Sequence, residues 1–290
     1  KFSLPSNIKS ILTYSFFIFL AGSAASILID IDKFMIPQKE AISQTAFYAV
    51  AVFIATVVEI PGRAMFQIIN PLVAKALNEN DTKELSNLYT KSSINLLIIA
   101  GLFFLLININ IDPFYELMSN PSYGDAIWVV LMISLSKLIL MSFGCGPAIL
   151  ATAKFYKITL PFSILMAISV YFLNDVLIDI YSINGAALST LLVVSIFTIV
   201  KIIYIKFKLN ISPYSVHSLK VLLIICAVYF LFEFISFSKE PRTIPLSNIL
   251  EILINTLLIS AIYSFLIYKS KSSESINSFI NNLLKGKLRL

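Results

Sequence analysis

Long apolar runs separated by short polar connections make up almost the whole chain. A helix needs about 20 apolar residues to cross a bilayer, and several runs, such as residues 10–29, reach that length without one charged side chain. The pattern predicts an all-α fold, a polytopic membrane helix bundle with about eight transmembrane helices, over residues 1–268. The expected spans are residues 10–31, 47–70, 92–111, 126–151, 158–178, 182–203, 220–238 and 248–268.

Two segments outside these runs mix apolar and charged positions at helical spacing. Residues 72–92 predict an interfacial helix, and residues 269–290 predict a basic amphipathic tail on the cytoplasmic side. The apolar side of the tail holds Ile276, Phe279, Ile280, Leu283 and Leu284. Both segments are interpreted as helices on the membrane surface, with docking of a partner as the alternative.

The composition leaves no room for a sizeable soluble domain. Of the 290 residues, 58% are hydrophobic and 13% charged, against about 25% charged in soluble domains. The only histidine is His217, and the two cysteines lie inside apolar runs, so zinc chemistry and histidine-based triads have almost nothing to build on. We therefore expect no catalytic residues, no metal site and no cofactor.

Basic residues predict the orientation in the membrane. The net charge is +6, but the lysines and arginines sit in short connections, where they act as topology signals rather than as a nucleic-acid surface. With the amino terminus in the cytoplasm, 17 of the 22 basic residues lie on the cytoplasmic side and Lys137 lies within a span. Only Lys33, Lys39, Lys239 and Arg242 lie outside. Both termini of this multi-pass chain are therefore predicted to be cytoplasmic.

The most specific motif is NDVLIDIYSINGAALST, residues 174–190. It resembles a pattern of the polysaccharide-export flippases of the MOP superfamily, the Wzx-type O-antigen and lipopolysaccharide translocases. In that pattern an Asn ends one span, a short hairpin follows, and small residues open the next span. The turn is expected to need Gly185, and small residues after it allow two helices to pack closely. Asp179, Tyr181 and Ser182 depart from the pattern, which more usually has Pro and Gly there.

Three further stretches are similar to the same family and follow its order. They are IDIDKFMI (29–36), AFYAVAVFIATVVEIPGRAMFQIINPLVAKAL (46–77) and NPSYGDAIWVVLMIS (120–134). The resemblance implies the second lobe of a MATE/MOP-type transporter, with the amino-terminal lobe missing from this chain. It further implies a bacterial inner (cytoplasmic) membrane and partners that include membrane lipids, that missing lobe and a lipid-linked oligosaccharide.

Three charged residues inside the predicted spans are candidates for the substrate cavity. Glu59 and Arg63 are four residues apart, on one helix face, on either side of Pro61 and Gly62. They form either an ion pair that braces a kinked helix or a site where Arg63 attracts the pyrophosphate of a lipid-linked sugar. Lys137 has no acidic residue within four positions, so it either lines the cavity or reaches Asp30 or Glu59 of another helix.

The resemblance also implies oxygen ligands for a coupling cation. The implied residues are Asp30, Asn174, Asp179 and Thr190, whose oxygens suit sodium or a proton relay. Asp175 belongs to the same region. The alternative is that Asp30, Asp32, Asp175 and Asp179 only mark the water interface.

The function implied by the resemblance is translocation of undecaprenyl-pyrophosphate-linked oligosaccharide across the membrane by alternating access. A multidrug-type cation antiporter of the same superfamily is the alternative. A membrane enzyme, such as a glycan polymerase or acyltransferase, is disfavoured because the connections are short and contain no cluster of His, Arg or Asp.

Overall fold

The predicted all-α membrane helix bundle is confirmed. The computed structural model describes residues 8–118, 120–152, 155–236 and 245–284, and these residues contain helices and no strand. Six of the helices they form are long and apolar enough to cross a membrane, and a shorter apolar helix precedes them. The elements are α1 (Ile8–Lys39), α2 (Ile42–Thr56), η1 (Val57–Glu59), α3 (Ile60–Asn78), α4 (Thr82–Glu116), η2 (Pro121–Ala126), α5 (Ile127–Ser142), α6 (Gly146–Ala151), α7 (Tyr156–Leu209), α8 (Val216–Ser236), α9 (Pro245–Ser270) and α10 (Glu274–Leu284).

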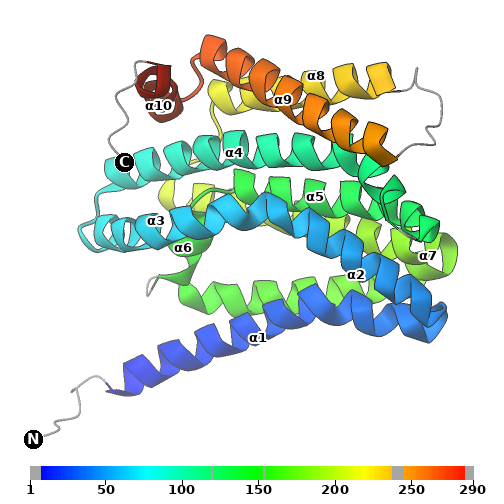
Figure 1. Ribbon diagram of the computed structural model, residues 1–290. Helices are drawn as coiled ribbons and strands as arrows, with labels where there is room; N and C mark the ends of the chain where they lie inside the picture. The colour runs from blue at the N-terminus through cyan, green and yellow to red at the C-terminus, as the bar shows by residue number, and fades with distance from the viewer. Residues whose placement is uncertain (1–7, 119, 153–154, 237–244, 285–290) are drawn as a thin grey trace, which may run out of the picture.

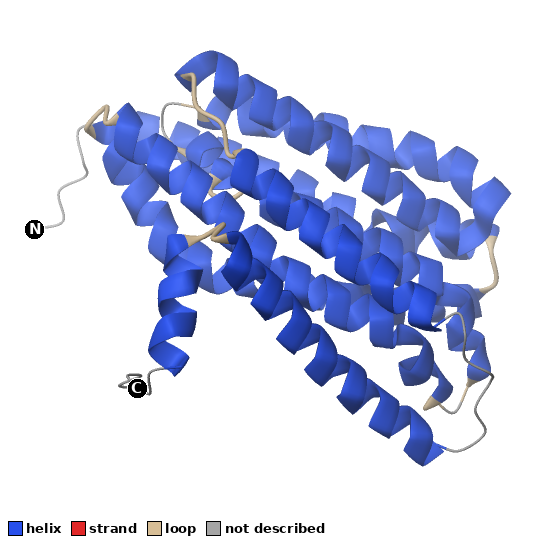
Figure 2. Ribbon diagram, turned by 90° about the horizontal axis from the view of Figure 1, so that it is seen from above, coloured by secondary structure: helices blue, strands red, loops and turns tan. Residues whose placement is uncertain are grey.

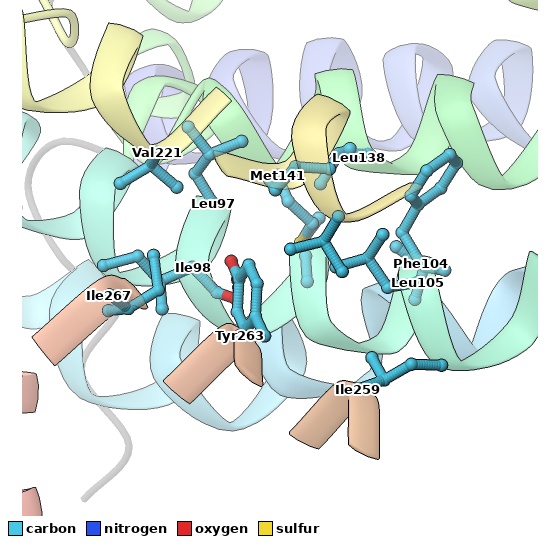
Figure 3. Close-up of a cluster of buried hydrophobic side chains, with 14 of the residues drawn as sticks. Leu97, Ile98, Phe104, Leu105, Leu138, Met141, Val221, Ile259, Tyr263 and Ile267 are labelled. Carbon is cyan, nitrogen blue, oxygen red and sulfur yellow. Dashed lines mark hydrogen bonds between the residues drawn. The ribbon is translucent and has the colours of Figure 1, made fainter. Parts of the chain in front are cut away.

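The long helices run side by side around α4 (Figure 1). α4 packs against α3, α5, α8 and α9, while α1 packs chiefly against α7. The largest apolar core lies around α4, and Figure 3 shows part of it, with Tyr263 of α9 next to Ile98. The Tyr263 hydroxyl donates a hydrogen bond to the Ile98 carbonyl oxygen at 2.9 Å, so this buried aromatic side chain also satisfies its polar atom.

The second span is broken near its middle. α2 ends at Thr56, one turn of 3₁₀-helix follows, and α3 restarts with Pro61 in its first turn. Proline has no N–H to donate to the preceding turn, so the regular α-helical hydrogen bonding cannot pass through this position. The break places Glu59 at the junction of the two helices.

α7 is 54 residues long and consists of two antiparallel halves. Tyr204 makes ring contacts with Phe162 and Phe155, and the Lys201 ammonium lies 3.4 Å from the Met166 sulfur. Residues this far apart in the sequence meet only if the chain folds back between them. The predicted spans 158–178 and 182–203 therefore form a helical hairpin, so that α7 supplies two of the predicted spans.

The turn of this hairpin differs from the expectation. Ser182, with φ 53° and ψ −135°, takes the left-handed conformation that was expected to need Gly185. Gly185 serves a different purpose, since a Cβ atom at this position would lie 1.9 Å from the Leu177 carbonyl oxygen. The absence of a side chain lets the two halves of α7 touch directly behind the turn.

The prediction of one interfacial helix over residues 72–92 is wrong. This segment contains the end of α3 and the start of α4, joined by a turn in which Asn80 has a positive φ of 54°. The Asp81 carboxylate accepts a hydrogen bond from the Glu84 N–H and so caps α4. The tail does form a separate helix, α10, but Leu283, Leu284 and residues 285–290 fall outside the described side chains.

α1 begins at the same end of the bundle at which α10 lies (Figure 1). We call this the near end. The opposite far end carries the α1–α2 connection at residues 40–41 and the turn at Ser182.

Candidate functional site

A buried carboxylate, Asp32 of α1, is the centre of the candidate site. Its side chain is only 3% exposed. The Asn174 amide donates to Asp32 Oδ1 at 2.6 Å, the Thr190 hydroxyl donates to Oδ2 at 3.0 Å, and the Tyr48 hydroxyl also donates to Oδ2. Three donors from other helix segments therefore converge on one acidic group inside the bundle.

Two helical hairpins bring these four residues together. Asp32 and Tyr48 each lie eight residues from Glu40, in the α1–α2 connection, and Asn174 and Thr190 each lie eight residues from Ser182. At 1.5 Å per helical residue, all four lie about 12 Å from the far-end turns. Because α1 packs on α7, the two pairs meet at the same depth.

The oxygen atoms of these side chains are suitable ligands for a small hard cation, and the carboxylate can also bind a proton. Carboxylate, amide and hydroxyl oxygens are the ligands that hard cations prefer, and a carboxylate can also take up a proton. The Asn174 side chain is fully buried, and its Oδ1 atom has no hydrogen-bond partner. An unpaired buried carbonyl oxygen next to a carboxylate is costly, and a bound cation would satisfy it.

The predicted coupling residues divide into two groups. Asn174 and Thr190 meet at Asp32, whereas Asp30 and Asp179 do not. Asp30 is exposed and pairs with Lys33 at 2.9 Å, and Asp179 pairs with Lys39 at 2.9 Å.

Lys39 joins the far end of α1 to α7. Its ammonium lies 2.8 Å from the Asp175 carboxylate and 2.9 Å from that of Asp179, and both carboxylates are largely exposed. Hydrogen bonds to Asp175 and Asp179 raise the pKa of Lys39 above its ordinary value. Lys39 therefore stays charged at neutral pH and holds the two helices together above the Asp32 site.

Asp32 itself was interpreted from the sequence only as a marker of the water interface. Helical periodicity carries a signal that separates it from Asp30. Two residues correspond to about 200° around a helix, so Asp30 and Asp32 point in nearly opposite directions. Met35 and Ile36, three and four positions after Asp32, are buried, which places Asp32 on the inward face of α1.

A second charged cluster joins α3 to α5. Glu59 accepts from Arg63 at 2.9 Å through Oε1 and from Lys137 at 2.9 Å through Oε2. Glu59 and Lys137 are each 18% exposed, whereas the Arg63 side chain is 67% exposed. The structure thus pairs Lys137 with Glu59, one of the two partners considered for it, and leaves Arg63 at the surface of the bundle.

A close helix contact makes the Glu59–Lys137 pair reachable. Gly62 faces Met141 of α5, and a Cβ atom at Gly62 would lie 2.6 Å from the Met141 sulfur. Met141 lies one helical turn after Lys137, so this contact brings the start of α3 within reach of the Lys137 side chain. The cluster carries two positive charges and one negative charge.

No protein-family model, no curated protein and no solved structure matches this chain at a significant level. The fold and the site define its class. It is a multi-pass, all-α membrane protein with a buried carboxylate site between two helical hairpins.

Proposed function

We propose that the chain is one lobe of a cation-coupled membrane transporter that moves a lipid-linked oligosaccharide between leaflets by alternating access. The observation that carries the transport proposal is the Asp32 site. A carboxylate inside a membrane bundle is costly, and ionisable groups kept there are most often part of ion pathways or proton relays. The unpaired Asn174 oxygen next to Asp32 supports a bound cation in particular.

Coupling requires that the cation changes the relative stability of two conformations. Asp32 and Tyr48 belong to the α1–α2 hairpin, and Asn174 and Thr190 belong to the α7 hairpin. A cation shared by both hairpins would hold them together, and its release would leave the carboxylate bonded by its three donors alone. We infer that movement of α1 against α7 is the step that the cation controls.

The substrate proposal rests on Arg63 together with the family resemblance. Arg63 lies in the cytoplasmic part of a predicted span, and its guanidinium is largely exposed on the isolated bundle. Arginine matches the geometry of phosphate oxygens through paired hydrogen bonds. The pyrophosphate of a lipid-linked sugar is a ligand of this kind.

The exposure of Arg63 also supports a second lobe. A charged side chain that faces lipid inside the hydrocarbon core is costly, and most costly at its centre. A partner lobe that forms the other wall of an aqueous cavity removes this cost and supplies the repeat interface where transporters bind substrate. We propose the amino-terminal lobe of the same transporter as this partner.

The distribution of basic residues supports an orientation with the near end in the cytoplasm. In the folded chain, Lys271 lies in a connection at the near end, and the near-end turns of the helices carry Lys75, Lys83, Lys206 and Lys208. Cytoplasmic connections are enriched in lysine and arginine. We propose the bacterial inner membrane as the location.

Lipid-linked glycan labelled with a radioactive sugar tests the function directly. Deletion of the gene in its host should leave the labelled lipid unchanged in mass but trapped in the cytoplasmic leaflet. Restoring the full-length gene should return the label to the outer leaflet, whereas a copy with Asp32→Asn should not. A copy with Asp30→Asn is the matched control and should restore export. A change in the mass of the lipid, with no change of leaflet, would indicate an enzyme and contradict the proposal.

One observation favours a second candidate, a multidrug-type cation antiporter. The buried Asp32 carboxylate can bind an organic cation as well as an inorganic one. The positive balance of the Glu59, Arg63 and Lys137 cluster disfavours a cationic substrate. If the deletion strain becomes sensitive to lipophilic cations and keeps normal glycan export, the antiporter is the function.

A further inference from the structure

An apolar pocket of about 550 Å³ lies in the near-end half of the bundle, between α3, α4, α9 and α10. Its volume is within the range of roughly 300–1,000 Å³ that is typical of ligand pockets. Its walls are almost entirely apolar, with the polar side chains of Asn95, Ser264 and Ser275 at a few positions. The ligand that fits such walls is a hydrocarbon chain.

The depth of the pocket restricts the source of this chain. Along α4 the pocket extends from Asn95 to Leu102, which is about 10 Å at 1.5 Å per residue. The hydrocarbon core of a bilayer is about 30 Å thick, so the pocket fits inside one leaflet. α10 lies across its near end and runs nearly perpendicular to the spans, seen end-on in Figure 1 and from the side in Figure 2. A helix in this orientation lies at the depth of the lipid headgroups.

Polar contacts hold α10 in place. The Ser273 hydroxyl donates to Asn95 Oδ1 at 2.6 Å, and the Tyr268 hydroxyl donates to Asn281 Oδ1 at 2.9 Å. The apolar side chains of α10 then line the pocket rather than closing it, and Phe279 remains 55% exposed. This apolar face is therefore available to a lipid chain.

Three lysines lie beyond the near end of the pocket, at headgroup depth. Lys269 and Lys271 line a separate surface hollow at the α9–α10 corner, together with Glu274, Asn277 and Ser278. Lys91 is exposed and lies one helical turn before Asn95, on the same face of α4. Lysines at this depth attract anionic headgroups.

We propose that this pocket is a binding site for one anionic phospholipid of the near-end leaflet. One acyl chain enters the space between α3, α4, α9 and α10, and the phosphate group lies among Lys91, Lys269 and Lys271. The site would tie α10 to the bundle through the lipid. It is separate from Asp32 and does not depend on the substrate of the transporter.

Photocrosslinking in vesicles tests the site. The chain is reconstituted with phosphatidylglycerol or phosphatidylcholine that carries the same diazirine-labelled acyl chain. Labelled peptides should include residues 95–102, 263–267 and 276–280, and labelling should be several-fold stronger with phosphatidylglycerol. Substitution of all three lysines by glutamine should remove this preference while leaving the labelled positions unchanged.

Pocket-filling variants supply the matched control. Ser264→Trp and Leu257→Trp both place a bulky side chain at an exposed position of α9, but only Ser264 lines the pocket. Labelling should fall several-fold in Ser264→Trp and in Ala64→Trp, on a different helix, and stay unchanged in Leu257→Trp. Equal labelling in all variants, or no preference for phosphatidylglycerol, would overturn the proposal. Displacement of the label by an equal amount of a polyprenyl phosphate would reassign the pocket to the transported lipid.

Discussion

The charge of the buried Asp32 carboxylate is only partly compensated by its neighbours. A carboxylate removed from water must be compensated by hydrogen bonds, by a cation or by a proton. Tyr48, Asn174 and Thr190 supply three hydrogen bonds, yet they leave the Asn174 oxygen unpaired beside the carboxylate. A cation bound here would therefore pair with the Asn174 oxygen and balance the charge of the Asp32 carboxylate.

Asp32→Asn should abolish the response of the folded chain to its coupling cation. Asparagine has nearly the same shape and can still bond its three neighbours, so the bundle should remain folded. A ligand present at 100 times its Kd stabilises a protein by about 2.7 kcal/mol. Unfolding of the purified protein in detergent should respond to sodium at constant ionic strength, or to pH, in the wild type and in Asp30→Asn. Asp32→Asn should lose the sodium response, or the part of the pH response that Asp32 carries, and a wild-type response in this variant would contradict the assignment.

Glu59 and Lys137 should be energetically coupled. Removing one member of a buried ion pair leaves an uncompensated charge, whereas removing both leaves none. Because Arg63 still contacts Glu59, we expect Lys137→Met to cost about 2 kcal/mol, below the 3–5 kcal/mol of a fully buried pair. The double variant with Glu59→Gln should cost less than the two single variants together. If the loss of unfolding free energy in the double variant equals the sum of the losses in the two single variants, the pair does not stabilise the fold.

At the scale of the elements, the two hairpins decide where the site forms. Each hairpin has one member of a polar pair eight residues before its turn and the other eight residues after it. The depth of the site is thus set by two turns, at Glu40 and at Ser182. A shift of either turn would move two of the four side chains to a different depth.

Gly185→Ala should disrupt the α7 hairpin. The added Cβ atom would lie 1.9 Å from the Leu177 carbonyl oxygen, and backbone atoms cannot rotate away as a side chain can. Overpacking costs typically 1–3 kcal/mol, and we expect about 3 kcal/mol or more here. Gly124→Ala is the control, since a Cβ atom there meets nothing within 4 Å, and its effect should stay within about 0.5 kcal/mol. Thermal unfolding in detergent and the yield of folded protein measure both, and equal behaviour of the two variants would refute the close contact.

At the scale of the whole molecule, the predicted eight membrane crossings place the start of α1 and the helix α10 on the same side of the membrane. With the near end in the cytoplasm, a cysteine in place of Glu40 should react with a charged maleimide added outside the cells. A cysteine in place of Asn80 should react only after the membrane is permeabilised. Reaction of both positions from the same side would refute the span count.

The native cysteines should not disturb this measurement. Cys145 is fully buried, and Cys226 lies on the outer face of α8, inside a span where lipid surrounds it. A charged maleimide does not enter the hydrocarbon core, so it does not reach either thiol. The unsubstituted chain should therefore show little labelling in either condition, and no cysteine-free variant is needed.

The sequence alone determined the class of the fold, because a bilayer imposes length and apolar character on each span independently of its neighbours. For the same reason it located the membrane-length segments and identified Glu59, Arg63 and Lys137 as charges that need an explanation. The motif at residues 174–190 also indicated a hairpin with close helix packing.

Only the tertiary structure decided which polar residues act together. Asp32 and Asn174 are 142 residues apart, and their contact depends on how α1 packs against α7, which local patterns do not encode. The same holds for Lys137, whose partner Glu59 lies 78 residues away. The turn at Ser182 and the true role of Gly185 were decided by the contact with Leu177, a steric constraint that exists only once the chain has folded back.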